Sequence, residues 1–144
     1  MPPPSMPAAD RLEEIFTLQK ELNRRIGVDT DAIRGDAAKQ GEWLLHYTRA
    51  MGQEVAELVD SVPWKWWAKY QTLDLDNAKV EIVDLLHFLV SAAQVAGMDA
   101  AEMFDLYARK HRLNRERQES GYARKDESDN RALFGAGGAP RAGG

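Results

Sequence analysis

Two pairs of acidic residues with the same spacing have the chemistry of a metal-binding site. Glu54 and Glu57 lie three residues apart, and Glu81 and Asp84 repeat that spacing further along the chain. Residues three apart in a helix share one face. Apolar residues surround both pairs, most densely in the segment 79–90, so the four carboxylates should converge near the core. Two like charges about 4 Å apart repel by roughly 4 kcal/mol at an effective dielectric constant near 20, and a bound cation removes this conflict.

The available ligands indicate which cation would bind. The sequence has no cysteine, and its three histidines are not clustered. Oxygen ligands favour hard ions, so the pattern predicts Mg²⁺ with several retained waters, and Mn²⁺ as a substitute. The alternative is that the acids are solvated, or paired with arginine and lysine from neighbouring helices. His87 could extend the site, although a packed and hydrogen-bonded histidine is the favoured interpretation.

A second set of residues could bind phosphate. Lys110, Asn114 and Arg117 follow one another at spacings of four and three, which keeps them on one helix face. Cations beside an acidic metal cluster suggest a polyphosphate ligand. Two alternatives are a solvated helix end, where the helix dipole favours cations, and a nucleic-acid surface. The second is weaker, because 19 basic residues against 23 acidic ones give a net charge of −4.

Helices must position these residues, since no segment has the period-two alternation of a strand. We predict helices over residues 10–26, 42–61, 77–96 and 99–119, with a polar, glycine-containing loop over 27–41. The predicted fold is an all-α bundle of four to five helices, completed by homo-oligomerisation as a dimer or a dimer of dimers. A domain over residues 10–134 would be flanked by disordered tails, a proline-rich one at 1–9 and a glycine- and alanine-rich one at 135–144.

Two amides stand out in the first predicted helix. Its expected buried stripe is Leu12, Ile15, Gln19, Leu22 and Ile26. Gln19 therefore lies within an apolar face, with Asn23 one turn further on, and both amides need hydrogen-bond partners there. The helix over 77–96 is apolar nearly all round, which predicts a place at the centre of the bundle.

Composition limits the remaining possibilities. No stretch approaches the roughly 20 apolar residues that span a bilayer, and the amino end lacks the pattern of a signal peptide, so we expect a cytoplasmic protein without a membrane or nucleic-acid partner. The segment PWKWW places three tryptophans within four positions. Trp67 is the candidate to stack on a base, and packing in the bundle or at a subunit interface is the alternative.

Taken together, these patterns resemble the all-α nucleoside triphosphate pyrophosphohydrolases, the superfamily of MazG and the dimeric dUTPases. The pair Glu54-x-x-Glu57, then 23 residues, then Glu81-x-x-Asp84 resembles their metal motif. Further segments resemble the dimeric dUTPase branch, in order: LQKELN, EVAELVDSVPWKWW, DNAKVEIVDLLHF, LNRERQESGY and DESDN.

This resemblance implies a Mg²⁺-dependent hydrolase that converts dUTP, and also dUDP, to dUMP through attack by a metal-activated water. Glu54, Glu57, Glu81 and Asp84 would bind the metal, and Glu54 or Glu57 would act as the base. Gln19 and Asn23 would recognise the base of the nucleotide. The residues that would hold sugar and phosphates are Lys110, Asn114, Arg117, Tyr122 and Lys125.

The chain also departs from that branch. Only about 25 residues separate Phe88 from Leu113, where dimeric dUTPases usually carry a long helical insertion. The segment after Tyr122 is short as well. A compact form of this kind could act on another deoxynucleotide, such as dCTP or a purine deoxynucleoside triphosphate. A non-enzymatic helical interaction module and a small nucleic-acid binder are the alternatives from other functional classes.

Overall fold

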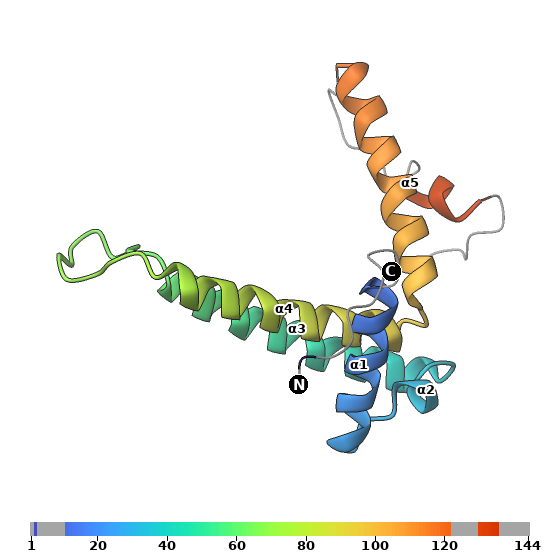
Figure 1. The fold of residues 1–144 in the computed structure, drawn as a ribbon. Coiled ribbons are helices and arrows are strands. Elements are labelled where there is room, and N and C mark those ends of the chain that lie inside the picture. The colour runs from blue at the N-terminus through green and yellow to red at the C-terminus, as the bar shows by residue number, and fades with distance from the viewer. Residues whose placement is uncertain (1, 3–10, 122–129, 136–144) are drawn as a thin grey trace. The chain divides into compact units, whose positions relative to one another are not determined.

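The protein is entirely helical wherever its structure is described. The computed structural model describes residue 2, residues 11–121 and residues 130–135. The helices are α1 (Arg11–Arg25), α2 (Thr30–Ile33), α3 (Ala37–Asp60), α4 (Leu75–Val95), α5 (Ala100–Glu119) and the short 3-10 helix η2 (Ala132–Phe134). Within these ranges there is no strand, which confirms the all-α prediction (Figure 1). The predicted tails lie almost entirely outside the described residues.

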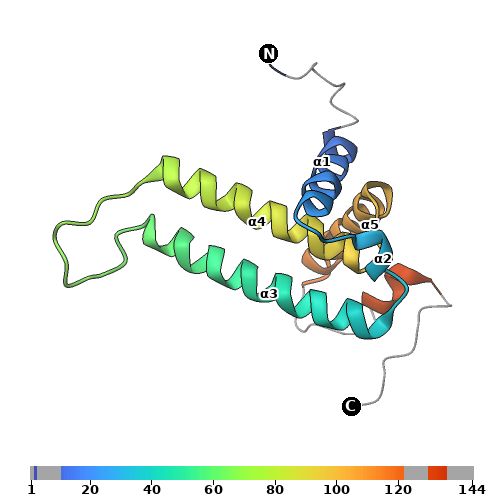
Figure 2. The ribbon, with the colours of Figure 1, turned by 90° about the horizontal axis from the view of Figure 1, so that it is seen from below.

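The chain divides into two compact units, Met1–Ala100 and Ala101–Gly144. In the first unit, α3 and α4 run antiparallel as a long hairpin, and the loop that joins them lies at the far end (Figures 1 and 2). Helices α1 and α2 both pack against α4. The hairpin therefore has one end covered by other helices and one end that projects as a tip.

Aspartate side chains start the helices of this unit. Asp29 accepts hydrogen bonds from the backbone N–H groups of the first turn of α2, Asp36 does so for α3, and Asp74 for α4. Such N-caps satisfy donors that have no partner inside the helix. The predicted loop over 27–41 was therefore partly wrong, because Asp29 and Asp36 nucleate α2 and the first turn of α3 within it.

A small hydrophobic core forms where α2, α3 and the last turns of α4 meet. Ile33, Tyr47 and Val95 are its buried members. Partly buried residues pack against them, namely Val28, Trp43, Leu44, Phe88 and Ala92. Gln40 ties the start of α3 to this core by donating to the carbonyl of Val95 at 2.9 Å.

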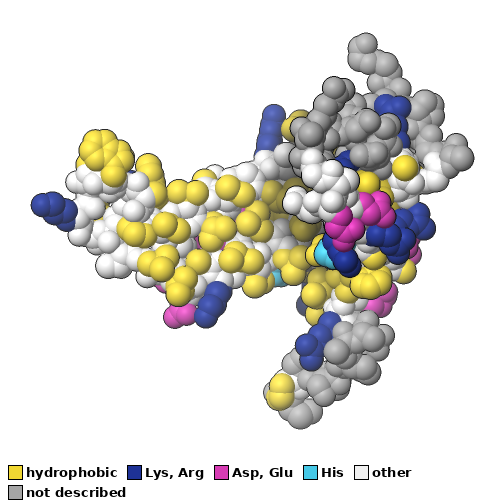
Figure 3. Space-filling model, turned by 90° about the horizontal axis from the view of Figure 1, so that it is seen from above, with side chains coloured by type: hydrophobic (Ala, Val, Ile, Leu, Met, Phe, Trp, Pro, Cys, Tyr) yellow, Lys and Arg dark blue, Asp and Glu magenta, His cyan; other side chains and the backbone are white. Residues whose placement is uncertain are grey.

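The composition of α4 predicted a central helix covered on all sides. Within a single chain, α4 is not covered in this way. Its buried residues, Val90, Ser91, Ala93, Gln94 and Val95, all lie in its last two turns. Earlier apolar residues remain 37–56% exposed: Val80, Ile82, Val83, Leu86 and Leu89. Hydrophobic side chains consequently spread over the hairpin arm (Figure 3). Before Val90, α4 has α3 as its main neighbour, which leaves an apolar face open.

The second unit holds α5 and η2. Arg109 on α5 donates to the carbonyl of Leu133 at 2.7 Å, and Lys110 donates to the Asn130 side chain, so the segment around η2 is fastened to the middle of the helix. Within the described part of the chain, no single helix is long and apolar enough to cross a membrane, although α4 and α5 taken together reach that length and hydropathy.

Candidate metal centre and base-binding groove

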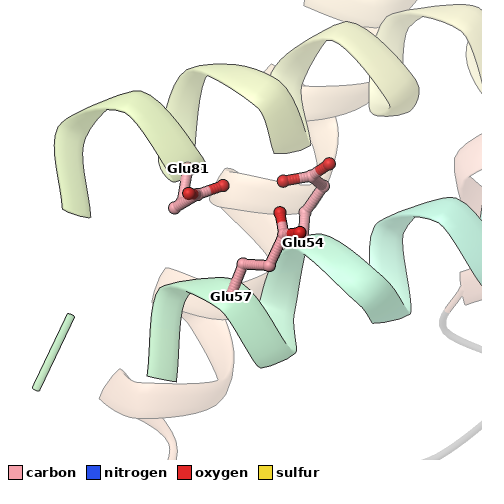
Figure 4. Close-up of side chains that lie close together, drawn as sticks. All are labelled: Glu54, Glu57 and Glu81. Carbon is pink, nitrogen blue, oxygen red and sulfur yellow. The ribbon is translucent and has the colours of Figure 1, made fainter. Parts of the chain in front are cut away.

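Three carboxylates converge near the tip of the hairpin. Glu54 and Glu57 come from α3 and Glu81 comes from α4, and all three point into the space between the two helices (Figure 4). One oxygen from each side chain lies within 4.8 Å of the others. Asp84, one turn beyond Glu81, lies outside this group of three, but its charge still acts on Glu54. The i, i+3 spacing on α3 contributes to this convergence, because it brings both glutamates of α3 to the face that meets α4.

The acids lack the partners that would make them a structural cluster. Glu54 Oε2 and Glu81 Oε2 are enclosed yet have no hydrogen-bond donor. No ion pair to any of the four acids is present among the described residues, although Lys79 pairs with Asp76 on the surface of α4. Buried polar oxygens normally have a partner, so these two require either a proton or a cation.

The electrostatics favour proton uptake when no cation is bound. A hydrogen bond with Glu81, then one with Glu57, raises the pKa of Glu54 to about 7, with smaller contributions from burial and the charges of Glu57 and Asp84. Two carboxylates can share a hydrogen bond only if one of them is protonated. The cluster therefore takes up a proton at a higher pH than an ordinary carboxylate does, and a divalent ion bound there would compete with that proton.

A chain of buried amides lies on α1, where this helix crosses α4. Asn23 donates through Nδ2 to Ser91 Oγ on α4 at 3.0 Å, and its Oδ1 accepts from Gln19 Nε2 at 3.1 Å. Gln19 is 7% exposed and Asn23 is 3% exposed. The expected burial of both amides, with hydrogen-bond partners, is confirmed.

The burial of α1 differs from the predicted stripe. Its buried residues are Phe16, Gln19 and Asn23, whereas Leu22 and Ile26 are 45% and 69% exposed. The stripe is shifted because polar contacts orient the helix: Asn23 bonds to Ser91, and Gln94 donates to the Phe16 carbonyl at 2.8 Å. Hydrophobic spacing alone does not report such contacts.

The uncovered apolar side of α1 forms a groove with α4. The groove has a volume of about 280 Å³. Its lining is Ile15, Leu18, Gln19, Leu22, Val83, Leu86 and His87. Gln19 is thus a polar group in a mostly apolar groove, the combination that binds and orients a small ring. His87 bonds through Nδ1 to the Val83 carbonyl at 2.9 Å, as the packed interpretation of this histidine expects.

A comparison with known protein families identifies the chain. A family model described as dUTPase matches residues 11–95, which is α1 through α4 and includes both acidic pairs and both amides. This chain belongs to the dUTPase family. It is also 38% identical over 113 residues to the dCTP pyrophosphatase of Enterobacteria phage T4. That match covers 78% of this chain but 55% of the phage protein, so the chain spans about half the length of this relative. No solved structure matches.

In this dUTPase-family chain, the tryptophan segment forms the loop at the hairpin tip. Trp67 is 59% exposed, and its ring meets those of Trp64 and Trp66 edge-on, with centroids 5.9 Å and 5.4 Å away. Lys65 places its ammonium group 5.6 Å from the Trp64 ring centroid. The loop starts one residue after α3 ends, so it lies close in sequence to Glu57. Trp67 is available to stack on a ligand, and none of the three rings is buried in this chain.

The expected phosphate-binding residues belong to the second unit. Lys110 and Arg117 are half-buried on α5 and both have interaction partners, whereas Asn114 is exposed. Tyr122 and Lys125 lie outside the described residues. The contacts described for the α5 residues are therefore those within the second unit.

Sequence reasoning missed Ser91. It lies seven residues after Asp84 on α4, which puts it on nearly the same helix face, and it is fully buried. A lone serine within the apolar segment 88–96 was the available signal, because a buried hydroxyl needs partners.

Proposed function

We propose that this chain is a Mg²⁺-dependent deoxynucleoside triphosphate pyrophosphohydrolase, and that its substrates are dUTP and dUDP, both converted to dUMP. The observation that carries this proposal is the group formed by Glu54, Glu57 and Glu81, with ligand oxygens within 4.8 Å of one another and two enclosed oxygens that lack a donor. Membership of the dUTPase family supports the same reaction class.

The residues fit a hard divalent cation. Every candidate ligand is a carboxylate oxygen, which Mg²⁺ prefers, and Mn²⁺ binds the same ligands. Glu54, Glu57 and Glu81 would hold the ion, with Asp84 adding negative charge one turn away. When bound, Mg²⁺ supplies positive charge against the phosphate oxygens and lowers the pKa of a nucleophilic water.

The side chains have separate tasks in the proposed reaction. Glu54 or Glu57 accepts the proton of the water that attacks the α-phosphorus, and the bond between the α-phosphorus and the bridging oxygen breaks. Pyrophosphate leaves from dUTP, and phosphate leaves from dUDP. Trp67 contributes an exposed ring at the hairpin tip to substrate binding. The proposed contacts to sugar and phosphate are Lys110, Asn114, Arg117, Tyr122 and Lys125.

The groove beside Gln19 is the proposed site for the base. The axial distance from Asp84 to Ser91 on α4 is roughly 10 Å, which a nucleotide spans when its phosphates lie at the acids and its base lies near α1. A second candidate substrate is dCTP, because the phage relative is a dCTP pyrophosphatase. A side-chain amide has both a donor and an acceptor and can pair with either pyrimidine.

A second copy of the chain is the proposed cover for the open face of α4. The exposed apolar residues of the hairpin include Val55 and Val59 on α3 as well as Val80, Ile82 and Leu89 on α4. Exposed apolar surface on this scale is unusual for a monomer. We therefore propose a homodimer or a dimer of dimers, tested by the mass measured in light scattering.

A non-enzymatic helical interaction module explains the open apolar face but not the acids. Such a protein gains nothing from three converging carboxylates, whose repulsion opposes folding. It predicts that neutralising Glu81 changes nothing but stability.

Turnover with separated substrates tests the proposed function. The purified chain is incubated with Mg²⁺ and each nucleoside triphosphate in turn, and with dUDP, and the products are identified. We expect dUMP with pyrophosphate from dUTP, and dUMP with phosphate from dUDP. Exclusive turnover of dCTP would keep the chemistry and reassign the base, whereas no turnover of any nucleotide would overturn the proposal.

A further inference from the structure

Ser91 uses its one hydroxyl proton within α4, at the crossing of α1 and α4. A serine hydroxyl has one proton to donate and two lone pairs that accept. Ser91 Oγ donates its proton to the carbonyl of His87 at 2.8 Å, one turn earlier in α4. It accepts from Asn23 Nδ2 at 3.0 Å. Since Ser91 has no second proton, it can face only the NH₂ end of the Asn23 amide.

The orientation of Asn23 determines the orientation of Gln19. With its NH₂ group turned to Ser91, Asn23 directs Oδ1 back along α1 toward Gln19, and this oxygen accepts from Gln19 Nε2 at 3.1 Å. Gln19 Oε1 is then left without a donor among the described residues, and it is not enclosed. Because Gln19 lines the groove, this carbonyl oxygen is available there as an acceptor.

We propose that Ser91 is a positioning residue that fixes the polarity of the Gln19 amide, so that the groove offers an acceptor to an N–H group of a pyrimidine ring. This rests on the proposed function, in which the base lies in that groove. Uracil has such a donor at N3, and cytosine has one at its exocyclic amine. Ser91 itself is 0% exposed and touches no ligand; it acts through Asn23.

Removal of the hydroxyl should release the whole chain of amides. In Ser91→Ala, Asn23 Nδ2 loses its acceptor and the amide can turn over. Asn23 would then donate to Gln19 Oε1, which leaves only N–H groups for the groove. A base N–H group would meet a donor in place of an acceptor, and buried polar groups without partners cost binding energy.

The chain contains a matched control at the other end of α4. Ser61 is 1% exposed and accepts from Asn77 Nδ2 at 2.7 Å, so Ser61→Ala removes the same kind of buried serine–asparagine bond. Ser61 and Asn77 do not line the groove. Ser91→Thr keeps a hydroxyl at the critical position and is the rescue variant.

Steady-state kinetics of the full chain with Mg²⁺, measured separately on dUTP and dCTP, test the proposal. In Ser91→Ala, we expect KM for the better pyrimidine to rise about tenfold while kcat changes less than about twofold, because the base contact is present in both the ground state and the transition state. Ser91→Thr should restore KM, and Ser61→Ala should leave it unchanged. A KM within about twofold of wild type in Ser91→Ala, or an equal rise in Ser61→Ala, would overturn the proposal.

Nuclear magnetic resonance of the side-chain amides separates this proposal from the proposed function. In ¹⁵N-labelled protein without nucleotide, the Gln19 NH₂ signals should shift and exchange faster in Ser91→Ala, but not in Ser61→Ala. If the wild type turned over no nucleotide, the proposed function would fail and these signals would still decide the role of Ser91. Unchanged Gln19 signals in Ser91→Ala would exclude that role.

Discussion

The two ends of α4 differ in the hydrogen bonding of their polar side chains. At its carboxyl end, Ser91 and the amide nitrogen of Gln94 are buried and bonded to α1. At its amino end, Glu81 is partly buried beside two further acids with an enclosed oxygen that has no donor, and its apolar neighbours are exposed. At one end of the helix, hydrogen bonds of Ser91 and Gln94 hold α4 to α1, although Gln94 Oε1 itself has no partner within the described part of the chain; at the other end, negative charge accumulates.

The two ends of α4 should therefore respond differently to a bound ligand. A satisfied polar network gains little from a ligand, because its hydrogen bonds are already made. An acidic cluster gains much from a cation, since the ion removes the repulsion that folding created. The tip of the hairpin is therefore the part of the first unit whose stability should depend most on what it binds.

Neutralising one acid at the tip should have the largest effect. In Glu81→Gln, we expect kcat/KM to fall about 100-fold or more, because one of three ligand oxygens becomes a weaker amide ligand. The same change should raise the melting temperature of the metal-free protein. Glu42→Gln, an exposed acid on α3, is the matched control and should retain activity. Near-normal turnover by Glu81→Gln would show that the acidic end of α4 does not bind a catalytic ion.

Mg²⁺ should stabilise the tip and not the crossing. At a concentration 100 times its Kd, a ligand that binds only the folded state adds about 2.7 kcal/mol to the free energy of unfolding. We expect a higher melting temperature in MgCl₂ than in NaCl of equal ionic strength, and loss of that difference in Glu81→Gln. If MgCl₂ raised the melting temperature of Glu81→Gln as much as that of the wild type, the ion would bind at another site.

Two asparagines allow the ends to be compared directly. Asn23→Ala removes a buried amide that links Gln19 to Ser91, and should lower the free energy of unfolding by about 2 kcal/mol. Asn77→Ala removes a part-buried amide at the tip, and should cost about 1 kcal/mol. Urea denaturation followed by circular dichroism measures both. If Asn77→Ala proved the more destabilising variant, the crossing would not be the main anchor.

The pH dependence of stability should differ between wild type and Glu54→Gln. Neighbouring acids raise the pKa of Glu54 from 4.5 to about 7 in the folded protein, so its contribution is fully present below pH 4.5 and is lost as the pH rises through about 7. In EDTA, the wild-type melting temperature should therefore fall over this range relative to that of Glu54→Gln. If the melting temperatures of the two proteins changed in parallel with pH, the raised pKa of Glu54 would be contradicted.

The smallest effect is expected at the tip loop. Trp66 is 89% exposed, so Trp66→Ala should change the free energy of unfolding by less than about 0.5 kcal/mol in the isolated chain. A larger loss in a concentration-dependent denaturation would show that a second copy covers this ring.

Much of the fold could be predicted from the sequence because its signals are local. Hydrophobic periodicity gives the long helices to within a few residues, except at the start of α3, where the N-cap Asp36 lay in the predicted loop. The dUTPase resemblance is confirmed by the family match. The exposure of Val80 and Ile82 could not be predicted, because periodicity records which residues are apolar and not which chain covers them.

Some features of the candidate site could likewise be predicted from the sequence, and others could not. The repeated spacing predicted the convergence of Glu54, Glu57 and Glu81, since it follows from helix geometry. It did not predict that Asp84 stands outside that group, which depends on how α3 and α4 pack. Gln19 and Asn23 could be recognised as amides in need of partners, but Ser91 is 68 residues from Asn23 and becomes its partner only through the crossing. Metal and substrate binding by these residues stay predictions.

The placement of the tryptophans also decides what intrinsic fluorescence reports. Three of the four lie in the tip loop, and the fourth, Trp43, packs against the core beside Tyr47. Emission from the native protein should thus be dominated by solvated indoles and lie at long wavelength. A blue shift on adding nucleotide or on raising protein concentration would report coverage of the tip, while the core can melt with little change in signal.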